Sequence, residues 1–438
     1  MSRQTAMLNA YVPGATDLPP ETAALIARRE AALGPAYRLF YEKPLHFLRG
    51  EGVWLHEADG SRYLDAYNNV ASLGHCHPRV VEAIAAQAAT LATHTRYLHD
   101  APVAYAERIL ATMPGIDHFM FTCTGSEAND LAVRMAQLWT GGEGIIVTEN
   151  AYHGVTRLVS GFSPALGQGA ALDPWVRTVP APNAFRDGDD AASDFANAVR
   201  AAVADLQRAG IKPAALFVDT IFSTDGILAG PGDLLSEAVA AIHDAGGLFI
   251  ADEVQPGFGR TGDRFWGFQR YDLRPDIVTM GKPMGNGYPV AGLGARRDIV
   301  AKFGAQQRYF NTFGGNPVAV AAASAVLDVI ADEGLQMNAA TTGAAFRQAL
   351  RETVHQGRFA DVRGAGLFIG VECVTAEGAP DPTLAQSLVT GLRNRRVLIS
   401  TAGAAGNVLK IRPPLIFGED HVAIFCDAVD DTFRELDG

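Results

Sequence analysis

Cysteine is scarce in this chain. Only Cys76, Cys123, Cys373 and Cys426 occur among 438 residues, and they show no CxxC or other paired spacing. Four scattered thiols in a chain of this length build neither a disulfide framework nor a zinc site. We therefore expect buried free thiols, a reducing compartment and a cytoplasmic protein.

Positive charge is also in short supply. Lys plus Arg number 36 against 48 Asp plus Glu, which gives a net charge of −12. Binding to nucleic acid or to anionic lipid depends on a basic surface. We therefore expect neither nucleic acid nor a membrane as a partner, and any basic groups that matter for function should be few and local.

Long hydrophobic runs are missing as well. The longest smooth apolar run, residues 318–327, is far shorter than the ~20 residues that a membrane-spanning helix needs. The opening MSRQTAMLNAYVPGATDLPP has no apolar segment of the secretory-signal kind. Hydrophobic residues at 48% and charged residues at 19% indicate a folded globular protein.

Short apolar runs alternate with helical patterns through the middle of the chain. The predicted strands lie in HFMFTCTG, GIIVTEN, AALFVDT, LFIADE and DIVTMGK. Such alternation is typical of a mostly parallel sheet covered by helices on both faces. The Pro- and Asp-rich stretch 163–194 is predicted to be a surface excursion.

The two ends of the chain are patterned differently. A helix is expected over 21–33, a hairpin in VWLHEADGSRYLDA, and a helix opened by Pro78 that runs to Leu91. After a long helix from about residue 319, strands are expected in GLFIGVECV and NVLKIRPPLIF, followed by a final helix. The predicted fold is α/β: a large domain over 66–330 and a smaller α+β domain built from 1–65 and 331–438.

CTGSEAND, residues 123–130, is the first segment that could carry chemistry. A strand runs through Gly125 and Ser126 directly into a helix, so unpaired N–H groups and the positive helix end point at one place. This arrangement suits a phosphate group. The alternative, Ser126 as an ordinary N-cap, fits the local pattern equally well, and no Lys-Ser/Thr pair follows as in a nucleotide P-loop.

Asp252 and Lys282 each close an apolar strand, in IADE and MGKP. Open α/β sheets bind ligands at the carboxyl ends of their strands. A buried lysine there can become a nucleophilic amine that forms a Schiff base, and a carboxylate nearby can pair with a pyridinium nitrogen. Taken singly, each residue is more simply a solvated lysine or a helix-capping aspartate.

Two other motifs carry less weight. GFGRTG at 257–262 matches the dinucleotide fingerprint, but it does not directly follow a strand and no amphipathic helix follows it. His75 and His77 in GHCHP have no carboxylate at a useful spacing, so we expect no metal site there and a helix capped by His77 instead.

The ordered set CTGSEAN, AYHG, ADEVQPGFGRTG, VTMGKPMGNGYPVAG and NTFGGNP resembles the class III aminotransferase family of pyridoxal-phosphate enzymes, over roughly residues 40–430. The resemblance implies fold type I and pyridoxal 5'-phosphate as cofactor. It also implies a homodimer with the active sites at the interface. Lys282 would carry the Schiff base and Asp252 would pair with the pyridine nitrogen. The remaining cofactor contacts would come from Gly125, Ser126, Tyr152, Val254, Gln255 and, from the neighbouring subunit, Thr312.

The chain departs from this resemblance at two carboxylate-binding positions. Where transaminases of the family commonly have a run like EPVQGEGG, this sequence has DTIFSTDG, residues 219–226. Thr224 replaces the second glutamate, which in the family pairs with an arginine. The loop STAGAAGN, residues 400–407, also lacks the arginine that holds a 2-oxo acid in many members.

Other segments resemble a narrower branch, the phospho-lyases acting on O-phosphoethanolamine or phosphohydroxylysine. These are NNVASLGHCHP, THTRYLHD, NTFGGNP and NVLKIRPPLIF. Arg96 and Asn69 take substrate-pocket positions there, and a guanidinium could bind a phosphate bidentately. The alternative for Arg96 is a surface or structural ion pair.

The leading hypothesis is therefore elimination of phosphate from a small phosphorylated amine, most simply O-phosphoethanolamine. The main alternative is an ω-amine or ω-amino acid:2-oxo acid transaminase with the same cofactor residues. A nicotinamide oxidoreductase that uses GFGRTG and a catalytically idle interaction protein are the remaining alternatives.

Overall fold

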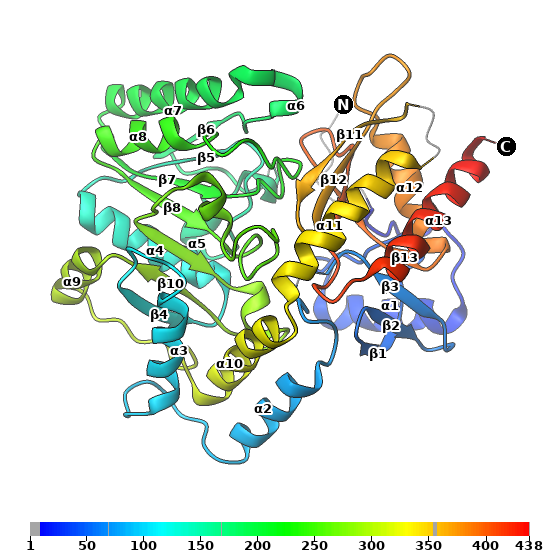
Figure 1. The fold of residues 1–438 in the computed structure, drawn as a ribbon, viewed down its shortest axis with the longest axis horizontal. Coiled ribbons are helices and arrows are strands. Elements are labelled where there is room, and N and C mark those ends of the chain that lie inside the picture. The colour runs from blue at the N-terminus through cyan, green and yellow to red at the C-terminus, as the bar shows by residue number, and fades with distance from the viewer. Residues whose placement is uncertain (1–8, 69, 168, 354–356, 438) are drawn as a thin grey trace.

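The computed structural model describes residues 9–437 apart from 69, 168 and 354–356. Its largest element is a seven-stranded sheet (Figure 1). In spatial order its strands are β4 (His118–Thr122), β10 (Ala291–Ala295), β9 (Ile277–Met280), β8 (Leu248–Asp252), β7 (Pro213–Asp219), β5 (Gly144–Thr148) and β6 (Val176–Val179). Strands β9, β8, β7, β5 and β6 are parallel, and β10 runs antiparallel to both its neighbours.

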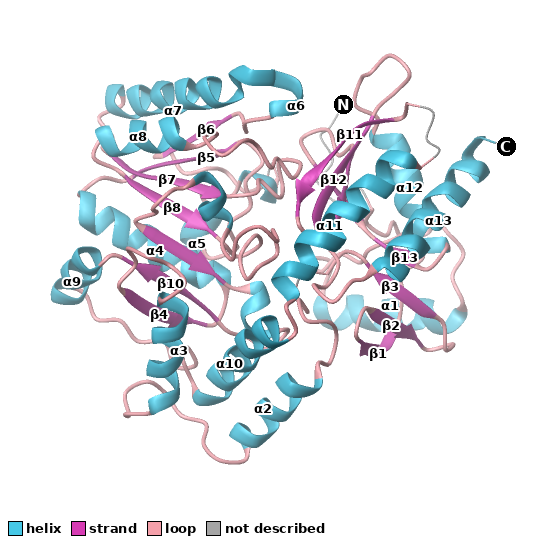
Figure 2. Cartoon of the chain, viewed as in Figure 1, coloured by secondary structure: helices cyan, strands magenta, loops and turns pink. Residues whose placement is uncertain are grey.

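Helices cover both faces of this sheet, as the apolar runs predict. Phe217 of β7 packs in the core beneath α4 (Gly125–Thr140) and α9 (Arg297–Gln306), whereas Leu216 and Val218 face the core beneath α7 (Ala191–Arg208) and α8 (Ser236–Asp244). Successive strand residues point to opposite faces, so a strand buried on both sides must be apolar throughout. Figure 2 shows the strands between the two helical layers.

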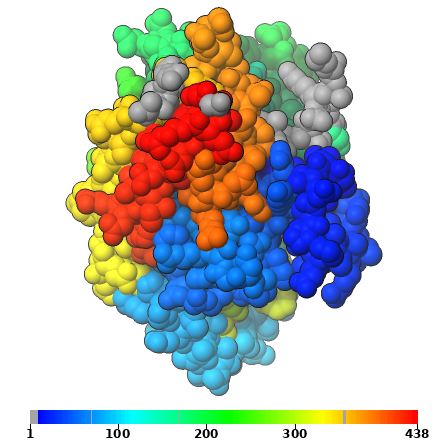
Figure 3. All heavy atoms as spheres, turned by 90° about the vertical axis from the view of Figure 1, so that its right-hand side faces the viewer, coloured from blue at the N-terminus to red at the C-terminus, as the bar shows by residue number. Residues whose placement is uncertain are grey.

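The rest of the chain forms two smaller sheets. The antiparallel one has the order β11 (Phe359–Ala365), β12 (Phe368–Cys373), β15 (Val408–Ile411) and β14 (Ser400–Ala402). The other has the order β1 (Phe47–Glu51), β2 (Trp54–Glu57), β3 (Arg62–Asp65) and β13 (Val397–Leu398), with β13 parallel to β3. Residues from near the two ends of the chain therefore share one sheet. In Figure 3 the N-terminal part, in blue, and the C-terminal part, in orange and red, lie side by side on the surface.

The remaining helices connect and cover these sheets. They are α1 (Pro20–Leu33), α2 (Pro78–Ala88), α3 (Asp100–Leu110), α5 (Arg157–Ser160), α6 (Ala184–Asp187), α10 (Pro317–Asp332), α11 (Leu335–Glu352), α12 (Pro382–Asn394) and α13 (Glu419–Asp437). Helix α10 packs on α2 and α3. The domain division at residues 65 and 330 stays a prediction. Among the described helices, none has the length and apolar character needed to cross a bilayer.

Several local expectations are wrong. The stretch 163–194 contains a strand, β6, whose Val176 pairs with Ile145; its short VRTV pattern becomes a strand only through that pairing. The Pro78 helix ends at Ala88, so Leu91 lies beyond it and is exposed. The sequence pattern also missed β10, because its small residues AGLGA carry no strand signal by themselves.

The cysteine and histidine expectations need correction too. All four thiols are free, but Cys76 is exposed, and only Cys373 is fully buried. His77 occupies the N-cap position of α2 without capping it; its Nε2 atom instead lies 3.3 Å from Glu333 Oε1. His75 pairs with Asp65. The described part of the chain contains no cluster of His, Cys, Asp and Glu able to hold a metal ion.

Candidate active site

Three charged side chains meet at the carboxyl edge of the large sheet. Asp219 ends β7 and Asp252 ends β8, and the two residues are direct partners in the parallel ladder. Lys282 follows β9 and opens a short 3₁₀ helix, Lys282–Gly285. Because parallel strands end at one edge, these three residues from separate strands are brought to one place.

A pocket at this edge is lined by most of the residues predicted to hold the cofactor. Its lining consists of Gly125, Ser126, Tyr152, His153, Gly154, Asp219, Asp252, Val254, Gln255 and Lys282. Thus all the predicted cofactor residues except Thr312 come together. His153 and Gly154 were missed, although both lie in the AYHG motif, and Asp219 was noted only as part of a sequence departure.

The start of α4 forms an open cradle beside this pocket. Thr124, not Ser126, is the N-cap: its hydroxyl accepts a hydrogen bond from the Glu127 N–H at 3.1 Å, and the Glu127 carboxylate accepts one from the Cys123 N–H at 2.7 Å. Gly125 and Ser126 are thereby left in the first turn, at the positive end of the helix. A Cβ on Gly125 would lie 2.9 Å from a Val254 methyl, so only glycine keeps this space open.

Asp252 is held in place by hydrogen bonds to both its oxygens. Oδ2 accepts from Asn129 Nδ2 at 3.0 Å and lies 2.7 Å from His153 Nδ1, while Oδ1 accepts from the Val254 N–H at 3.0 Å. The carboxylate is buried and faces the pocket. It is therefore a fixed acceptor, of the kind that a protonated pyridine nitrogen needs as a partner.

Lys282 lies in surroundings that disfavour the charged form of its amine. Burial lowers its pKa, and the positive charge of Arg412 lowers it further, against the opposing effect of Asp252 and Asp219. A lysine whose pKa is depressed in this way carries more of the neutral form that attacks a carbonyl group. The environment of Lys282 therefore suits Schiff-base formation.

Two basic residues that the sequence analysis overlooked lie beside the pocket. The Arg412 guanidinium donates to the Tyr67 carbonyl at 3.0 Å and to Gln255 Oε1, and it lies 4.7 Å from the Tyr67 ring centre. Lys410 Nζ donates to the Ser223 carbonyl at 2.8 Å. Burial lowers the pKa of both. The alternation of basic and apolar residues in LKIR was the available signal, because it places two cations on one face of β15 and its extension.

Arg96 and Thr312, by contrast, are exposed and do not line this pocket. Arg96 lies with its guanidinium 3.8 Å from the centre of the Phe310 ring, and it forms no ion pair within the described residues. The structural ion pair considered for it is therefore absent there. Asn69 lies outside the described residues.

The loops that depart from the transaminase pattern lie together. The Gly403 N–H donates to the Thr224 carbonyl at 3.0 Å, which joins the arginine-free loop 400–407 to the run 219–226. The two altered segments are therefore neighbours in the structure. GFGRTG forms a series of turns, with Arg260 buried and donating to the Leu367 carbonyl at 3.1 Å. It is not the strand–turn–helix of a dinucleotide site.

The residues present fit pyridoxal phosphate. The open cradle at Gly125 suits its phosphate, the fixed carboxylate of Asp252 suits its ring nitrogen, and the Lys282 amine suits its aldehyde. Val254 and Tyr152 line the space between these three groups, where the ring would lie.

Comparison with known proteins supports the same cofactor. Residues 41–433 match the family described as aminotransferase class-III. An ethanolamine-phosphate phospho-lyase homolog 1 from Caenorhabditis elegans is 36% identical, covering 93% of this chain and 92% of that protein. An alanine–glyoxylate aminotransferase 2-like protein from Drosophila melanogaster is 38% identical, covering 91% and 85%.

A solved structure is similar over nearly the whole chain. It is a phospholyase from Arthrobacter in complex with phosphoethanolamine, 39% identical, with a TM-score of 0.91 and coverage of 94% of this chain and 99% of that one.

Proposed function

Because this chain belongs to the class III aminotransferase family of pyridoxal-phosphate enzymes, we propose that it eliminates phosphate from a small phosphorylated amine, O-phosphoethanolamine, to give acetaldehyde, ammonia and phosphate. The similarity to a phospho-lyase homolog and to a phospholyase bound to phosphoethanolamine supports this reaction class.

The observation that carries the proposal is the pair of buried cations beside Lys282. Neither Arg412 nor Lys410 forms an ion pair with a carboxylate within the described residues. Burying a cation without a directly paired carboxylate is costly, even with the Asp219 carboxylate farther off. A phosphate dianion entering the pocket would supply that counter-charge, and an arginine with a lysine is a strong donor set for it.

The reaction needs one proton removed and one bond broken. The Lys282 amine takes the proton from the carbon that bears nitrogen. Pyridoxal phosphate, when bound, supplies the sink for the electron pair left behind. Asp252 keeps the ring nitrogen protonated. The carbon–oxygen bond to phosphate then breaks and the oxygen leaves with its electron pair. Arg412 and Lys410 stabilise the charge on the departing phosphate. Water hydrolyses the resulting enamine to aldehyde and ammonia.

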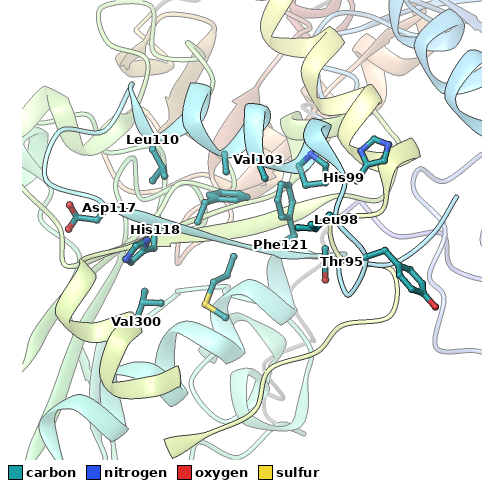
Figure 4. Close-up of a pocket in the computed structure, with 14 residues that line it drawn as sticks. Thr95, Leu98, His99, Val103, Leu110, Asp117, His118, Phe121 and Val300 are labelled. Carbon is teal, nitrogen blue, oxygen red and sulfur yellow. The ribbon is translucent and has the colours of Figure 1, made fainter. Parts of the chain in front are cut away.

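Arg96 enters the proposal through a second subunit. Tyr97 and Leu98 follow it in the chain, and Phe313 follows Phe310, on whose ring the guanidinium lies; these three residues are exposed to 67%, 105% and 68%. A neighbouring groove of about 510 Å³, lined by Leu98, Val103 and Phe121 among others, extends this apolar surface (Figure 4). An apolar surface of this kind indicates a protein interface. We propose a homodimer in which Arg96 and Thr312 act at the partner's site.

Mixing an inactive variant with an impaired one tests this arrangement. Lys282→Ala and Arg96→Ala subunits, dissociated and reassociated together, should form heterodimers with one intact site. About a quarter of wild-type activity should return in an equal mixture, because half the dimers are mixed and each has one good site. Activity equal to the mean of the two parent variants would show that Arg96 does not act across subunits.

The second candidate is an ω-amine:2-oxo acid transaminase. Its support is the similarity to an alanine–glyoxylate aminotransferase 2-like protein. Against it, neither Thr224 nor the neighbouring loop 400–407 has a charged side chain that could pair with the carboxylate of a 2-oxo acid.

A single-turnover experiment separates the two candidates. The holoenzyme is mixed with O-phosphoethanolamine, and inorganic phosphate, ammonia and pyridoxamine phosphate are measured. Phosphate and ammonia in equal amounts support the lyase. Pyridoxamine phosphate without phosphate release supports the transaminase. Ethanolamine, which lacks the leaving group, is the control substrate, and ethanolamine or β-alanine with pyruvate tests transamination directly.

A further inference from the structure

Ser223 lies at the junction of the two buried cations. It is fully buried in the turn after β7. Its carbonyl oxygen accepts from Lys410 Nζ at 2.8 Å, and its hydroxyl oxygen accepts from Gln255 Nε2. Gln255 in turn accepts from the Arg412 guanidinium. One serine therefore contacts Lys410 directly and Arg412 through a single amide.

The direction of these hydrogen bonds is determined by Asp219. The Ser223 hydroxyl donates to Asp219 Oδ2, and the Ser223 N–H donates to the same atom at 3.1 Å. A hydroxyl has one proton to donate, so its lone pair is left for the Gln255 amide N–H. The Gln255 carbonyl then faces Arg412. In this series of hydrogen bonds each donor points toward Asp219: Arg412 donates to Gln255, Gln255 to Ser223, and Ser223 to Asp219.

The surroundings of the cations leave them available for an anion. Arg412 lies against the face of Tyr67, and both Arg412 and Lys410 lie within 6 Å of the centre of the Phe368 ring. The groups that accept their hydrogen bonds are neutral oxygens. The Asp219 carboxylate acts on both cations electrostatically but forms an ion pair with neither within the described residues. Neutral partners orient a cation without cancelling its charge, whereas a carboxylate would compete with an incoming phosphate.

We propose that Ser223 is a positioning residue that holds Arg412 and Lys410 in place for the phosphate group of the substrate. This inference rests on the proposed phospho-lyase function and deepens it. Ser223 stands where the transaminase-like run EPVQGEGG has its first glycine, which has no hydroxyl. Together with Asp219 it therefore marks a difference in specificity and not only in packing.

Binding of inorganic phosphate to the holoenzyme tests the proposal. With the hydroxyl gone in Ser223→Ala, the Gln255 amide loses the acceptor of its Nε2 group, which weakens the orientation of the oxygen that faces Arg412, so phosphate should bind about tenfold more weakly by calorimetry. Ser223→Cys, of similar size but a poor donor, should show the same loss. Thr432→Val is the matched control, because among the described residues that buried hydroxyl bonds only to the Ala428 carbonyl of its own helix.

Steady-state kinetics separate positioning from a general structural role. Both Ser223 variants should raise KM for O-phosphoethanolamine about tenfold. The rate at which ethanolamine reacts with the bound cofactor, followed by absorbance, should stay at the wild-type value. Equal slowing for both amines, or unchanged phosphate affinity in both variants, would overturn the proposal.

The outcomes also distinguish this inference from the proposed function. A wild-type enzyme that releases no phosphate from O-phosphoethanolamine, yet binds inorganic phosphate in a Ser223-dependent way, retains the positioning role and loses the lyase reaction. Normal phosphate release, together with phosphate binding that does not depend on Ser223, retains the lyase reaction and overturns the positioning role. A wild-type holoenzyme that binds no phosphate overturns the positioning role.

Discussion

The Nδ1 atom of His153 lies 2.7 Å from Oδ2 of Asp252. The other ring nitrogen of His153, Nε2, is buried without a hydrogen-bond partner, and the imidazole packs 4.6 Å from the ring centre of Phe217. A proton on Nδ1 is the arrangement that satisfies Asp252. His153 therefore donates to the carboxylate and fixes its orientation.

Replacing Asp252 should remove the electron sink. Asp252→Asn keeps the shape of the side chain but loses the charge that keeps the ring nitrogen protonated, so we expect kcat to fall by several orders of magnitude with little change in melting temperature. Stopped-flow measurement of proton removal from the substrate checks this. Near-normal kcat would show that Asp252 is not the partner of the ring nitrogen.

His153→Phe is the matched comparison for that variant. Phenylalanine preserves the ring packing against Phe217 but cannot donate to Asp252, so kcat should fall only about tenfold, the loss expected for one hydrogen bond.

Lys282→Ala should abolish turnover. No other amine lines the pocket within the described residues, and the neighbouring Lys410 is held by the Ser223 carbonyl, so no second amine is in place to form the Schiff base or move the proton. The protein should still fold and bind the cofactor non-covalently through Gly125, Ser126 and Asp252, which dialysis and absorbance spectra can show. Lys302→Ala, a surface lysine bonded to the Trp139 carbonyl, is the control. Sustained phosphate release by the Lys282 variant would refute the mechanism.

Gly125→Ala should weaken cofactor binding. The new Cβ would lie 2.9 and 3.0 Å from the two methyl groups of Val254, which must then move toward the space for the cofactor ring. We expect at least a tenfold rise in the dissociation constant of pyridoxal phosphate, measured by fluorescence titration of the apoenzyme. Gly304→Ala is the control, since nothing lies within 4 Å of its added Cβ. Equal affinities in both variants would contradict the cradle.

Arg96→Ala should lower kcat/KM for O-phosphoethanolamine by roughly ten- to a hundredfold, the loss expected for a charge-assisted contact to phosphate. Arg96→Lys should recover only part of this, because an ammonium group lacks the two-pronged geometry. Reaction of the cofactor with ethanolamine should be unaffected. Arg200→Ala, which removes another exposed arginine, serves as control. Parallel losses for phosphorylated and unphosphorylated amines would remove Arg96 from the substrate site.

Glu253 should make stability depend on pH. Burial raises the pKa of Glu253 to about 7, even though its carboxylate accepts hydrogen bonds from Thr220 and from the Gly267 and Phe268 N–H groups. The folded state therefore binds more protons than the unfolded state between the ordinary glutamate pKa and about 7. Its stability falls as pH rises through that window.

Glu253→Gln cannot ionise and should lack this dependence. The difference in melting temperature between wild type and Glu253→Gln should shift in favour of the variant from pH 5 to pH 8. Glu82→Gln, which alters an exposed glutamate, should keep a constant difference. A pH-independent difference for Glu253→Gln as well would contradict the raised pKa.

Much of the fold and the cofactor pocket could be predicted from the sequence, because both depend on local patterns. Asp252 and Lys282 each follow a continuous apolar run, and parallel strands place their carboxyl ends at one edge whatever the rest of the chain does. Gly125 and Ser126 stand at a strand-to-helix turn, where N–H groups are unpaired in any such turn. These residues needed only their near neighbours to be recognised.

Other features depended on packing between segments far apart in the chain. Arg412 and Gln255 are 157 residues apart, and no local pattern shows that β15 brings one beside the other. The pairing of β6 with β5, the buried His153 beside Asp252 and the surface position of Arg96 likewise depend on tertiary contacts. The sequence by itself determined which residues end the strands and open the helix, because backbone hydrogen bonding and strand periodicity are local. Only the tertiary structure decided which cations lie beside Lys282 and which arginine faces solvent, because burial and charge pairing are set by whichever elements pack together.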